Sequence, residues 1–171
     1  MRPTADNLAW VGLGSNLGES RRILTDAAAE LESWSRLPLT RSSLWRSSPV
    51  DCPPGSPDFL NAVVGITPAP DQTPERLLSK LLTLERAWGR RPKQTPNEPR
   101  PLDLDLLTFA RMTRATAQLT LPHPRAHLRR FVLAPWNEVA PDLILPGNTA
   151  TIAGLLARLR TDERLVCLGP W

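Results

Sequence analysis

The stretch from Arg100 to Leu107 (Arg-Pro-Leu-Asp-Leu-Asp-Leu-Leu) constrains the fold most, because apolar and acidic residues alternate along it. Successive side chains on a β-strand point to opposite faces, so Asp103 and Asp105 share one face while the leucines between and beside them share the other. We therefore expect a strand that packs its leucines on a core and presents two carboxylates. With Cα atoms roughly 6.5 Å apart, these carboxylates can reach one hard cation or a pair of Mg²⁺ ions.

Alternation alone does not establish a ligand site, because a half-buried strand with a solvated acidic face shows the same pattern. The segment before the strand favours a site. Residues 90–100 hold four cationic side chains (Arg90, Arg91, Lys93 and Arg100) and three prolines. Arginine offers a planar fork to phosphate oxygens and lysine a mobile charge, so cations beside Mg²⁺ are suited to a polyphosphate.

Length and composition predict one domain over residues 1–171, with 1–7 as a flexible N-terminal extension. The chain has 171 residues, of which 41% are hydrophobic, enough for one core. There is no run of eighteen apolar residues and no signal-peptide pattern at the start, from which we expect a cytoplasmic protein. Cys52 and Cys167 have no metal-ligand spacing, so unpaired thiols are expected. A net charge of +4 admits either nucleic acid or a phosphate-rich small ligand.

Hydrophobic periodicity predicts strands at residues 8–14, 39–46, 58–67, 102–107 and 116–121, with helices at 19–35, 73–88, 131–139 and 151–160. The order β-α-β-β-α-β, followed by a short strand and two helices, indicates an α+β fold. We expect a ferredoxin-like core with a mostly antiparallel sheet and helices on both faces. The glycines after the first strand do not have the spacing of a phosphate-binding loop or a dinucleotide motif.

Two further features remain open on the residues alone. Asn61 lies in an otherwise apolar strand, where its amide either satisfies backbone groups or reads the edge of a heterocycle. Residues 122–131 hold both histidines, His123 and His127, and several arginines, which form either a solvated loop or a second set of phosphate ligands.

Five motifs, in order along residues 8–146, resemble the 6-hydroxymethyl-7,8-dihydropterin pyrophosphokinase family of folate biosynthesis. Each motif is weak alone, but five at suitable separations are specific. They are Gly-Leu-Gly-Ser-Asn-Leu-Gly at 12–18, Asp-Phe-Leu-Asn-Ala-Val at 58–63, Leu-Glu-Arg at 84–86, Pro99-Arg100 with Asp-Leu-Asp at 103–105, and Leu-Pro-His-Pro-Arg at 121–125 with Phe-Val-Leu at 131–133.

The resemblance implies that pyrophosphate passes from ATP to the pterin hydroxymethyl group with release of AMP. It assigns Asp103 and Asp105 to two Mg²⁺ ions, and Arg90, Lys93 and Arg100 to catalysis by neutralising phosphate charge. It implies ATP binding by Glu85, Arg90, Arg100, Thr120, His123 and Arg129. It implies pterin binding by Gly14, Ser47, Ser48, Pro49, Val50, Phe59, Asn61 and Phe131, with the two phenylalanines sandwiching the ring.

The sequence departs from the family pattern at four positions. Asn97 and Glu98 stand where many members have tryptophan and glycine, Pro124 where some have tyrosine, and Gln118 where some have an arginine that contacts the nucleotide. These departures bear on loop closure and on nucleotide contacts. The two aspartates and Arg100 are intact, so an active enzyme is expected.

Two other function classes fit part of the sequence. An RNA-binding module would suit the topology and basic charge, but carboxylates on its sheet would face a polyanion. A two-metal phosphodiesterase or nuclease would use the same two aspartates but generally needs further ligands. As partners we expect ATP and the pterin, with no nucleic acid and no membrane, and we expect a monomer.

Overall fold

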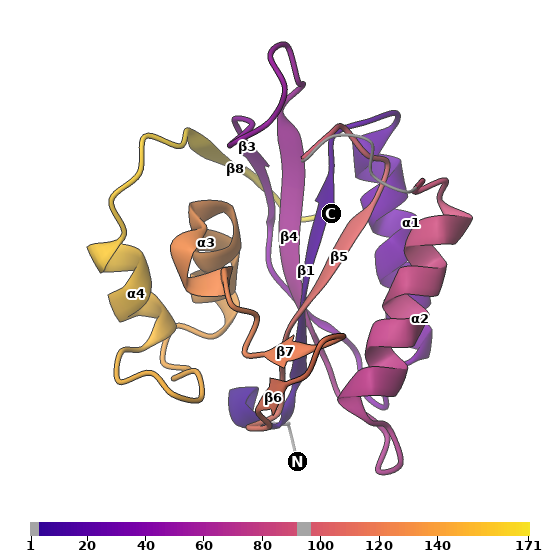
Figure 1. Cartoon of the computed structure of the whole chain (residues 1–171), viewed down its shortest axis with the longest axis vertical. Coiled ribbons are helices and arrows are strands. Elements are labelled where there is room, and N and C mark those ends of the chain that lie inside the picture. Colours follow the sequence, from indigo (N-terminus) through magenta and orange to yellow (C-terminus); the bar gives the residue numbers. More distant parts are fainter. Residues whose placement is uncertain (1–3, 92–96) are drawn as a thin grey trace.

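The computed structural model describes residues 4–91 and 97–171 as one sheet with helices on both faces (Figure 1). Helices α1 (Ser20–Ser33) and α2 (Pro74–Ala87) cover one face of the sheet. Helices α3 (Arg130–Val139) and α4 (Ile152–Arg158) lie on the other side. The sheet contains β1 (Ala9–Ser15), β2 (Thr40–Arg41), β3 (Leu44–Ser47), β4 (Phe59–Ile66), β5 (Asp103–Phe109) and β8 (Leu165–Gly169).

Strand order along the sheet is β5-β1-β4-β3-β8, with β2 also paired to β4. Each neighbouring pair is antiparallel. Each β-α-β unit therefore joins two parallel strands with another strand between them, which is the ferredoxin-like arrangement expected from the sequence. The order brings β5, with its aspartates, next to β1, and sets it at the opposite edge of the sheet from β8.

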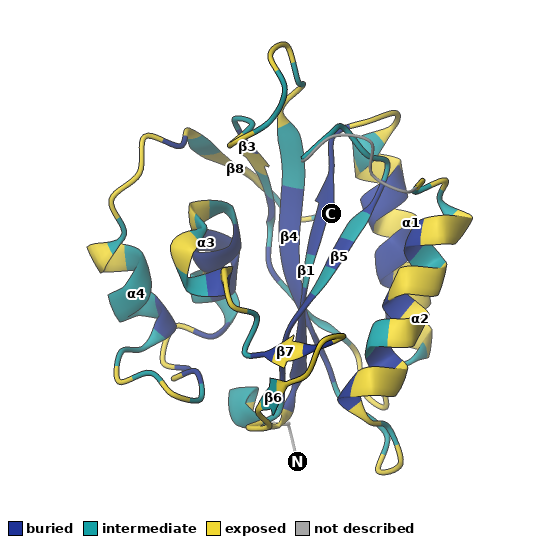
Figure 2. Cartoon of the chain, in the orientation of Figure 1, coloured by how far each residue is buried: buried dark blue, intermediate teal, exposed yellow. Residues whose placement is uncertain are grey.

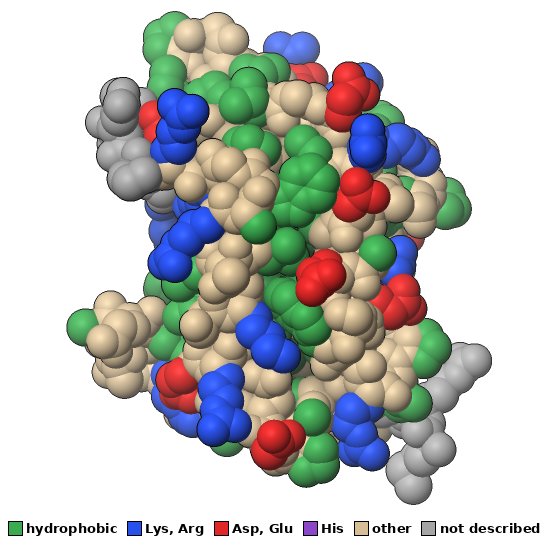
Figure 3. All heavy atoms as spheres, turned by 90° about the vertical axis from the view of Figure 1, so that its right-hand side faces the viewer, with side chains coloured by type: hydrophobic (Ala, Val, Ile, Leu, Met, Phe, Trp, Pro, Cys, Tyr) green, Lys and Arg blue, Asp and Glu red, His purple; other side chains and the backbone are tan. Residues whose placement is uncertain are grey.

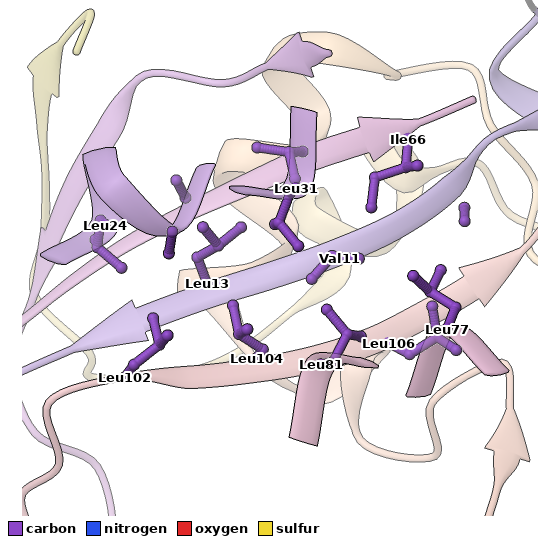
Figure 4. Close-up of a cluster of buried hydrophobic side chains, with 14 of the residues drawn as sticks. Val11, Leu13, Leu24, Leu31, Ile66, Leu77, Leu81, Leu102, Leu104 and Leu106 are labelled. Carbon is purple, nitrogen blue, oxygen red and sulfur yellow. The ribbon is translucent and has the colours of Figure 1, made fainter. Parts of the chain in front are cut away.

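Two hydrophobic clusters hold the layers together. The first lies between the sheet and α1 and α2, where Leu24, Leu31, Leu77 and Leu81 meet the apolar faces of β1 and β5 (Figure 4). The second lies under α3 around Trp10 and Trp136, whose rings are 6.0 Å apart. Because the strands are covered on both sides, their central residues are buried while the outer faces of α1 and α2 are exposed (Figure 2). Over those helices, acidic and basic side chains are interspersed (Figure 3).

Helix α2 begins as its sequence predicts. The Thr73 hydroxyl accepts a hydrogen bond from the Arg76 amide, and Pro74 occupies the first turn, where no amide donor is needed. Its buried stripe then reaches the end of the helix at Glu85, an acidic residue placed against β5. The helix therefore fixes one side of the site described below.

The predicted strand at residues 39–46 is interrupted at Ser42. The Ser42 hydroxyl accepts a hydrogen bond from the Val63 amide at 2.9 Å, while the Ser42 amide donates to the Val63 carbonyl oxygen at 3.0 Å. The Ser42 hydroxyl thus takes the place of a main-chain carbonyl oxygen as the acceptor for a strand amide, so two short strands form instead of one. Strand β8 is absent from the sequence prediction, which ended at the last helix. Part of the N-terminal segment expected to be flexible forms a 3₁₀ helix, Ala5–Asn7, held by the Trp10 indole N–H, which donates to the Ala5 carbonyl.

A small hairpin and a 3₁₀ helix lie beside the sheet. Strands β6 (Arg114–Ala115) and β7 (Thr120–Leu121) pair with each other, the second of them falling within the strand predicted at 116–121. The 3₁₀ helix Ala126–Leu128 follows, and leads into α3. This segment carries His123 past β5, because the His123 amide donates a 2.8 Å hydrogen bond to the Leu107 carbonyl oxygen.

Candidate active site

Strand β5 has the two-faced character that its sequence predicts. Leu102, Leu104 and Leu106 are buried in the core, while the Asp103 and Asp105 side chains are 18% and 31% exposed on the opposite face. The carboxylates are therefore held by a rigid strand near solvent, at a place where a ligand can reach them.

Two arginines converge on the Asp103 carboxylate. Arg90 Nη1 lies 2.8 Å from Oδ1 and Arg100 Nη2 lies 2.9 Å from Oδ2. Arg90 also pairs with Glu85. Burial lowers the pKa of Arg90, but Asp103 and Glu85 more than offset this, so its pKa is raised and the guanidinium stays charged.

Asp105 has a separate set of basic neighbours. Arg129 Nη1 lies 3.1 Å from Oδ2, and His123 Nε2 lies 3.9 Å from Oδ1. Burial, and then the nearby Asp103 charge, raise the pKa of Asp105, whereas burial lowers the pKa of His123. Asp105 thus resists carrying a negative charge beside Asp103, and a bound cation would relieve that repulsion.

Glu85 is the buried acid of the site. Its side chain is 2% exposed, and its Oε1 accepts a hydrogen bond from the Leu104 amide at 2.7 Å. Burial raises the pKa of Glu85 to about 7, despite that hydrogen bond and the Arg90 charge. Glu85 therefore ties α2 to β5 and orients Arg90 toward Asp103.

A cavity of about 280 Å³ opens on one side of the aspartates. Its wall includes Phe59 and Phe131, and the Asn61 amide, which donates a 2.8 Å hydrogen bond to the Ser47 hydroxyl. The Arg100 guanidinium lies 5.7 Å from the Phe59 ring centre, and Arg129 lies 5.5 Å from that of Phe131. Two aromatic rings and a fixed amide suit a flat heterocycle with polar edges.

A second cavity, of about 300 Å³, lies on the other side, between α2 and the hairpin of β6 and β7. Glu85, Arg90, Thr120 and His123 line it. Asp105 lines both cavities, so the carboxylate face of β5 is the junction between them.

Asn16, which is buried just after β1, positions the segment that leads into β5. Its side-chain Oδ1 accepts a 2.9 Å hydrogen bond from the Arg100 main-chain amide, and its main-chain N–H donates to the Arg100 carbonyl oxygen at 3.2 Å. Its side-chain amide reaches the Pro57 carbonyl oxygen. One residue thereby fixes the backbone of Arg100 next to the loop before Phe59, which explains the close approach of Arg100 to both Asp103 and the phenylalanine ring.

The structure brings most of the predicted site residues together around β5. Those predicted to bind the pterin line the first cavity, except Pro49, which is not among its lining residues. Arg100 and Arg129 also line the first cavity, whereas the other predicted ATP residues line the second. Lys93 lies outside the described residues. Cavity residues that the sequence analysis missed include Asp51, Cys52, Arg125, Leu128, Thr161 and Glu163.

The carboxylate pair is the candidate metal site. Within residues 4–91 and 97–171, no group of three or more His, Cys, Asp and Glu side chains is placed to hold a metal ion. Mg²⁺ commonly takes one or two carboxylates from the protein and the rest of its oxygen ligands from substrate phosphates and water, so two aspartates fit a metal delivered with a polyphosphate. In the part of the chain that the structure describes, no helix is long and apolar enough to cross a membrane.

Paired carboxylates, converging arginines and two cavities that meet at them define a phosphoryl-transfer enzyme. Residues 10–141 match the family model of 7,8-dihydro-6-hydroxymethylpterin-pyrophosphokinase. A 2-amino-4-hydroxy-6-hydroxymethyldihydropteridine pyrophosphokinase from Synechocystis is 37% identical over 95% of this chain and 78% of its own length. The enzyme of the same name from Haemophilus influenzae is 35% identical over 95% of this chain and 98% of its own length.

Solved structures agree on the fold. The wild-type HPPK-DHPS of Plasmodium falciparum superposes with a TM-score of 0.65 at 13% identity, covering 89% of this chain and 44% of that one. An HPPK-DHPS in complex with substrates gives a TM-score of 0.66 at 12% identity, covering 88% and 43%. This chain thus spans less than half of those longer proteins.

The chain belongs to the 7,8-dihydro-6-hydroxymethylpterin-pyrophosphokinase family. It is a pyrophosphokinase, and the activity of its family is pyrophosphoryl transfer from ATP to hydroxymethyldihydropterin in folate biosynthesis.

Proposed function

We propose that the carboxylate face of β5 is where this chain joins its two substrates, with the pterin in the first cavity and ATP in the second. The observation that carries this proposal is the position of Asp105, which lines both cavities. A transfer reaction needs its two substrates to meet in line at one place, and that place should be rich in groups that offset phosphate charge.

The pterin site uses Gly14, Phe59, Asn61 and Phe131. The ring stacks between the two phenylalanines, and Asn61, whose amide nitrogen is engaged by Ser47, offers its carbonyl oxygen to an N–H of the ring. Gly14 lies beside Asn61, and a Cβ at this position would be in contact with the Asn61 side-chain oxygen, at 3.4 Å. The loop at Ser47, Ser48, Pro49 and Val50 closes the edge of the ring with backbone groups.

The nucleotide site uses Glu85, Thr120 and His123 in the second cavity. Arg90, Arg100 and Arg129, which pair with the aspartates, bind the phosphates. In the free protein the arginines neutralise Asp103 and Asp105. When phosphates bind, these guanidinium groups are free to turn onto phosphate oxygens while cations replace them at the carboxylates. The same residues thus keep the site compact before and during the reaction.

Asp103 and Asp105 would hold two Mg²⁺ ions, which when bound would offset the negative charge of the triphosphate. The pterin hydroxyl oxygen bonds to the β-phosphorus, the bond to the AMP oxygen breaks, and the hydroxyl proton leaves to water. The described residues offer no strong base at the hydroxyl position, so the chain contributes positioning and charge compensation. As the sequence analysis expects, we propose that a monomer is active.

An assay of AMP release tests this function. The purified chain is mixed with MgCl₂, ATP and 6-hydroxymethyl-7,8-dihydropterin, alongside the same mixture without the pterin. We expect AMP only when the pterin is present, without ADP. Production of ADP, or AMP release that does not depend on the pterin, would contradict the proposal.

A further inference from the structure

The segment after α4 forms a wall of the first cavity, although it lies beyond the residues that match the family model. Thr161 and Glu163 line the cavity. The segment is bound to the loop at residues 47–50, because the Ser48 amide donates to the Arg164 carbonyl oxygen at 3.0 Å and the Arg164 amide donates to the Ser48 hydroxyl at 3.1 Å. This chain therefore closes its cavity with a C-terminal segment of fixed position.

Glu163, in this segment, has a side-chain carboxyl group whose hydrogen-bonding capacity is only partly used by the described residues. It is 7% exposed, and its Oε1 has no hydrogen-bond partner among the described residues. The Arg130 guanidinium donates to the main-chain oxygen of Glu163, at 3.3 Å, and the Glu163 amide donates to the Thr161 hydroxyl. The segment is thus well held while a carboxyl oxygen remains unsatisfied, which is unfavourable for the fold alone.

The surroundings of Glu163 make it a carboxyl group that would gain from a donor. Burial raises its pKa to about 7, an effect that the Phe131 and Arg130 amides and the Arg130 charge only partly oppose. An N–H donor from a ligand would replace the water that the carboxyl has lost. Phe131, whose amide reaches the carboxyl, also lines the cavity, so Glu163 stands beside a proposed stacking ring.

Sheet order sets the direction in which a ligand in this cavity must lie. Asp103 and Asp105 are on β5 at one edge of the sheet, while Glu163 lies two residues before β8 at the other edge. A pterin in the cavity that turns its hydroxymethyl group toward the aspartates therefore turns its opposite end, the aminopyrimidinone, toward Ser48 and Glu163.

We propose that Glu163 is a specificity-determining pterin-binding residue, whose carboxyl group accepts N–H donors of the 2-amino group. This inference rests on the proposed placement of the pterin in the first cavity. Paired N–H donors match a carboxylate, and a buried acceptor left unpaired penalises a ligand that lacks the donor. Asn61 and Glu163 would then read the ring from two sides.

The test compares two ligands on variants of the whole chain. Dissociation constants are measured with MgCl₂ and a non-hydrolysable ATP analogue, for 6-hydroxymethyl-7,8-dihydropterin and for its analogue with hydrogen in place of the 2-amino group. The variants are Glu163→Gln, which removes the charge, Glu163→Met, which removes both acceptors, and the exposed control Glu30→Gln.

We expect the pterin to bind about 10-fold more weakly to Glu163→Gln and about 100-fold more weakly to Glu163→Met, in line with a hydrogen bond to a charged group. The dissociation constant of the analogue should differ by less than about threefold between the variants and the unmodified chain. The variants therefore lose most of the preference for the ligand that carries the 2-amino group. If Glu163 only supports α3, both ligands weaken by the same factor and the preference persists, which overturns the proposal. Failure of the unmodified chain to bind the pterin would instead overturn the proposed function.

Discussion

The carboxyl groups at the two ends of the first cavity differ in their partners. At the β5 end, Asp103 and Asp105 are paired with Arg90, Arg100 and Arg129. At the end next to β8, the Glu163 carboxyl has an oxygen with no hydrogen-bond partner in the part of the chain that the structure describes. At the β5 end the carboxylates already have arginine partners, so a ligand must replace those ion pairs with its own. A metal ion and phosphates can do so, because they bring charges of both signs. At the Glu163 end, a neutral ligand with N–H donors can form hydrogen bonds without breaking an existing ion pair.

Replacing Asp105 with asparagine should have the largest effect, because it removes a metal-binding charge at the junction of the cavities. Turnover should fall by about 10³-fold or more, as expected when several kcal/mol of charge stabilisation are lost. Thermal stability should be unchanged or higher, since burial and Asp103 raise the pKa of Asp105. Steady-state AMP release and thermal unfolding measure both. Normal turnover in Asp105→Asn would refute the metal assignment, and the exposed Asp142→Asn is the control.

Replacing Leu104, the residue between the two aspartates, should mainly lower the stability of the fold, whereas Asp105→Asn mainly lowers turnover. Leu104 is 3% exposed in the core against α1 and α2, so Leu104→Ala should lower the free energy of unfolding by about 2–5 kcal/mol. Denaturant unfolding measures this, with the exposed Leu37→Ala as control. A loss below about 1 kcal/mol would show that the leucine face of β5 is not the core face.

Arg100→Lys keeps the charge but loses the planar fork that joins Asp103 and lies over the Phe59 ring. We expect kcat to fall about 10- to 100-fold with a smaller change in KM, because the fork acts on charge that develops during transfer. Arg22→Lys, on the exposed face of α1, is the matched control. An unchanged kcat would remove Arg100 from catalysis and leave it a structural anchor of the loop.

Glu163→Gln should make the chain more stable at high pH while weakening pterin binding. The folded-state pKa of Glu163 is about 7, above its ordinary value of 4.5, so the folded state prefers the protonated carboxyl. Its favourable contribution is full below pH 4.5 and is lost as the pH rises through 7. Relative to the unmodified chain, Glu163→Gln should therefore gain stability between pH 5 and pH 8, on the order of 2 kcal/mol. Parallel stability curves for the two proteins would contradict this account.

Local patterns were sufficient to predict much of the sheet, the helices and the carboxylate strand. Alternation placed the aspartates of β5, and the cap at Thr73 placed the start of α2, because both depend on residues near in sequence. The split at Ser42 could not be predicted, because it depends on a hydroxyl meeting the Val63 amide on another strand. Strand β8 had a local signal, the apolar run from Leu165 to Leu168, but its pairing with β3 depends on the whole sheet.

Site residues divide in the same way. The family resemblance, which covers residues 8–146, supplied the predicted site residues, and most of those that the structure describes line the two cavities. Thr161 and Glu163 lie beyond that range, and they reach the first cavity because β8 pairs with β3, next to the loop at residues 47–50. Glu163 lies between an aspartate and an arginine, and this local pattern indicates a solvent-exposed charge. The burial of Glu163 depends on the tertiary packing, so the spacing of neighbouring residues could not predict it.

The most direct test of the account is a crystal structure of the chain with Mn²⁺, a non-hydrolysable ATP analogue and 6-hydroxymethyl-7,8-dihydropterin. Anomalous scattering should place two Mn²⁺ ions at the Asp103 and Asp105 carboxylates. The pterin hydroxymethyl group should face these ions, with its 2-amino group at Glu163. Metal bound away from these aspartates, or a pterin turned with its amino group toward β5, would contradict it.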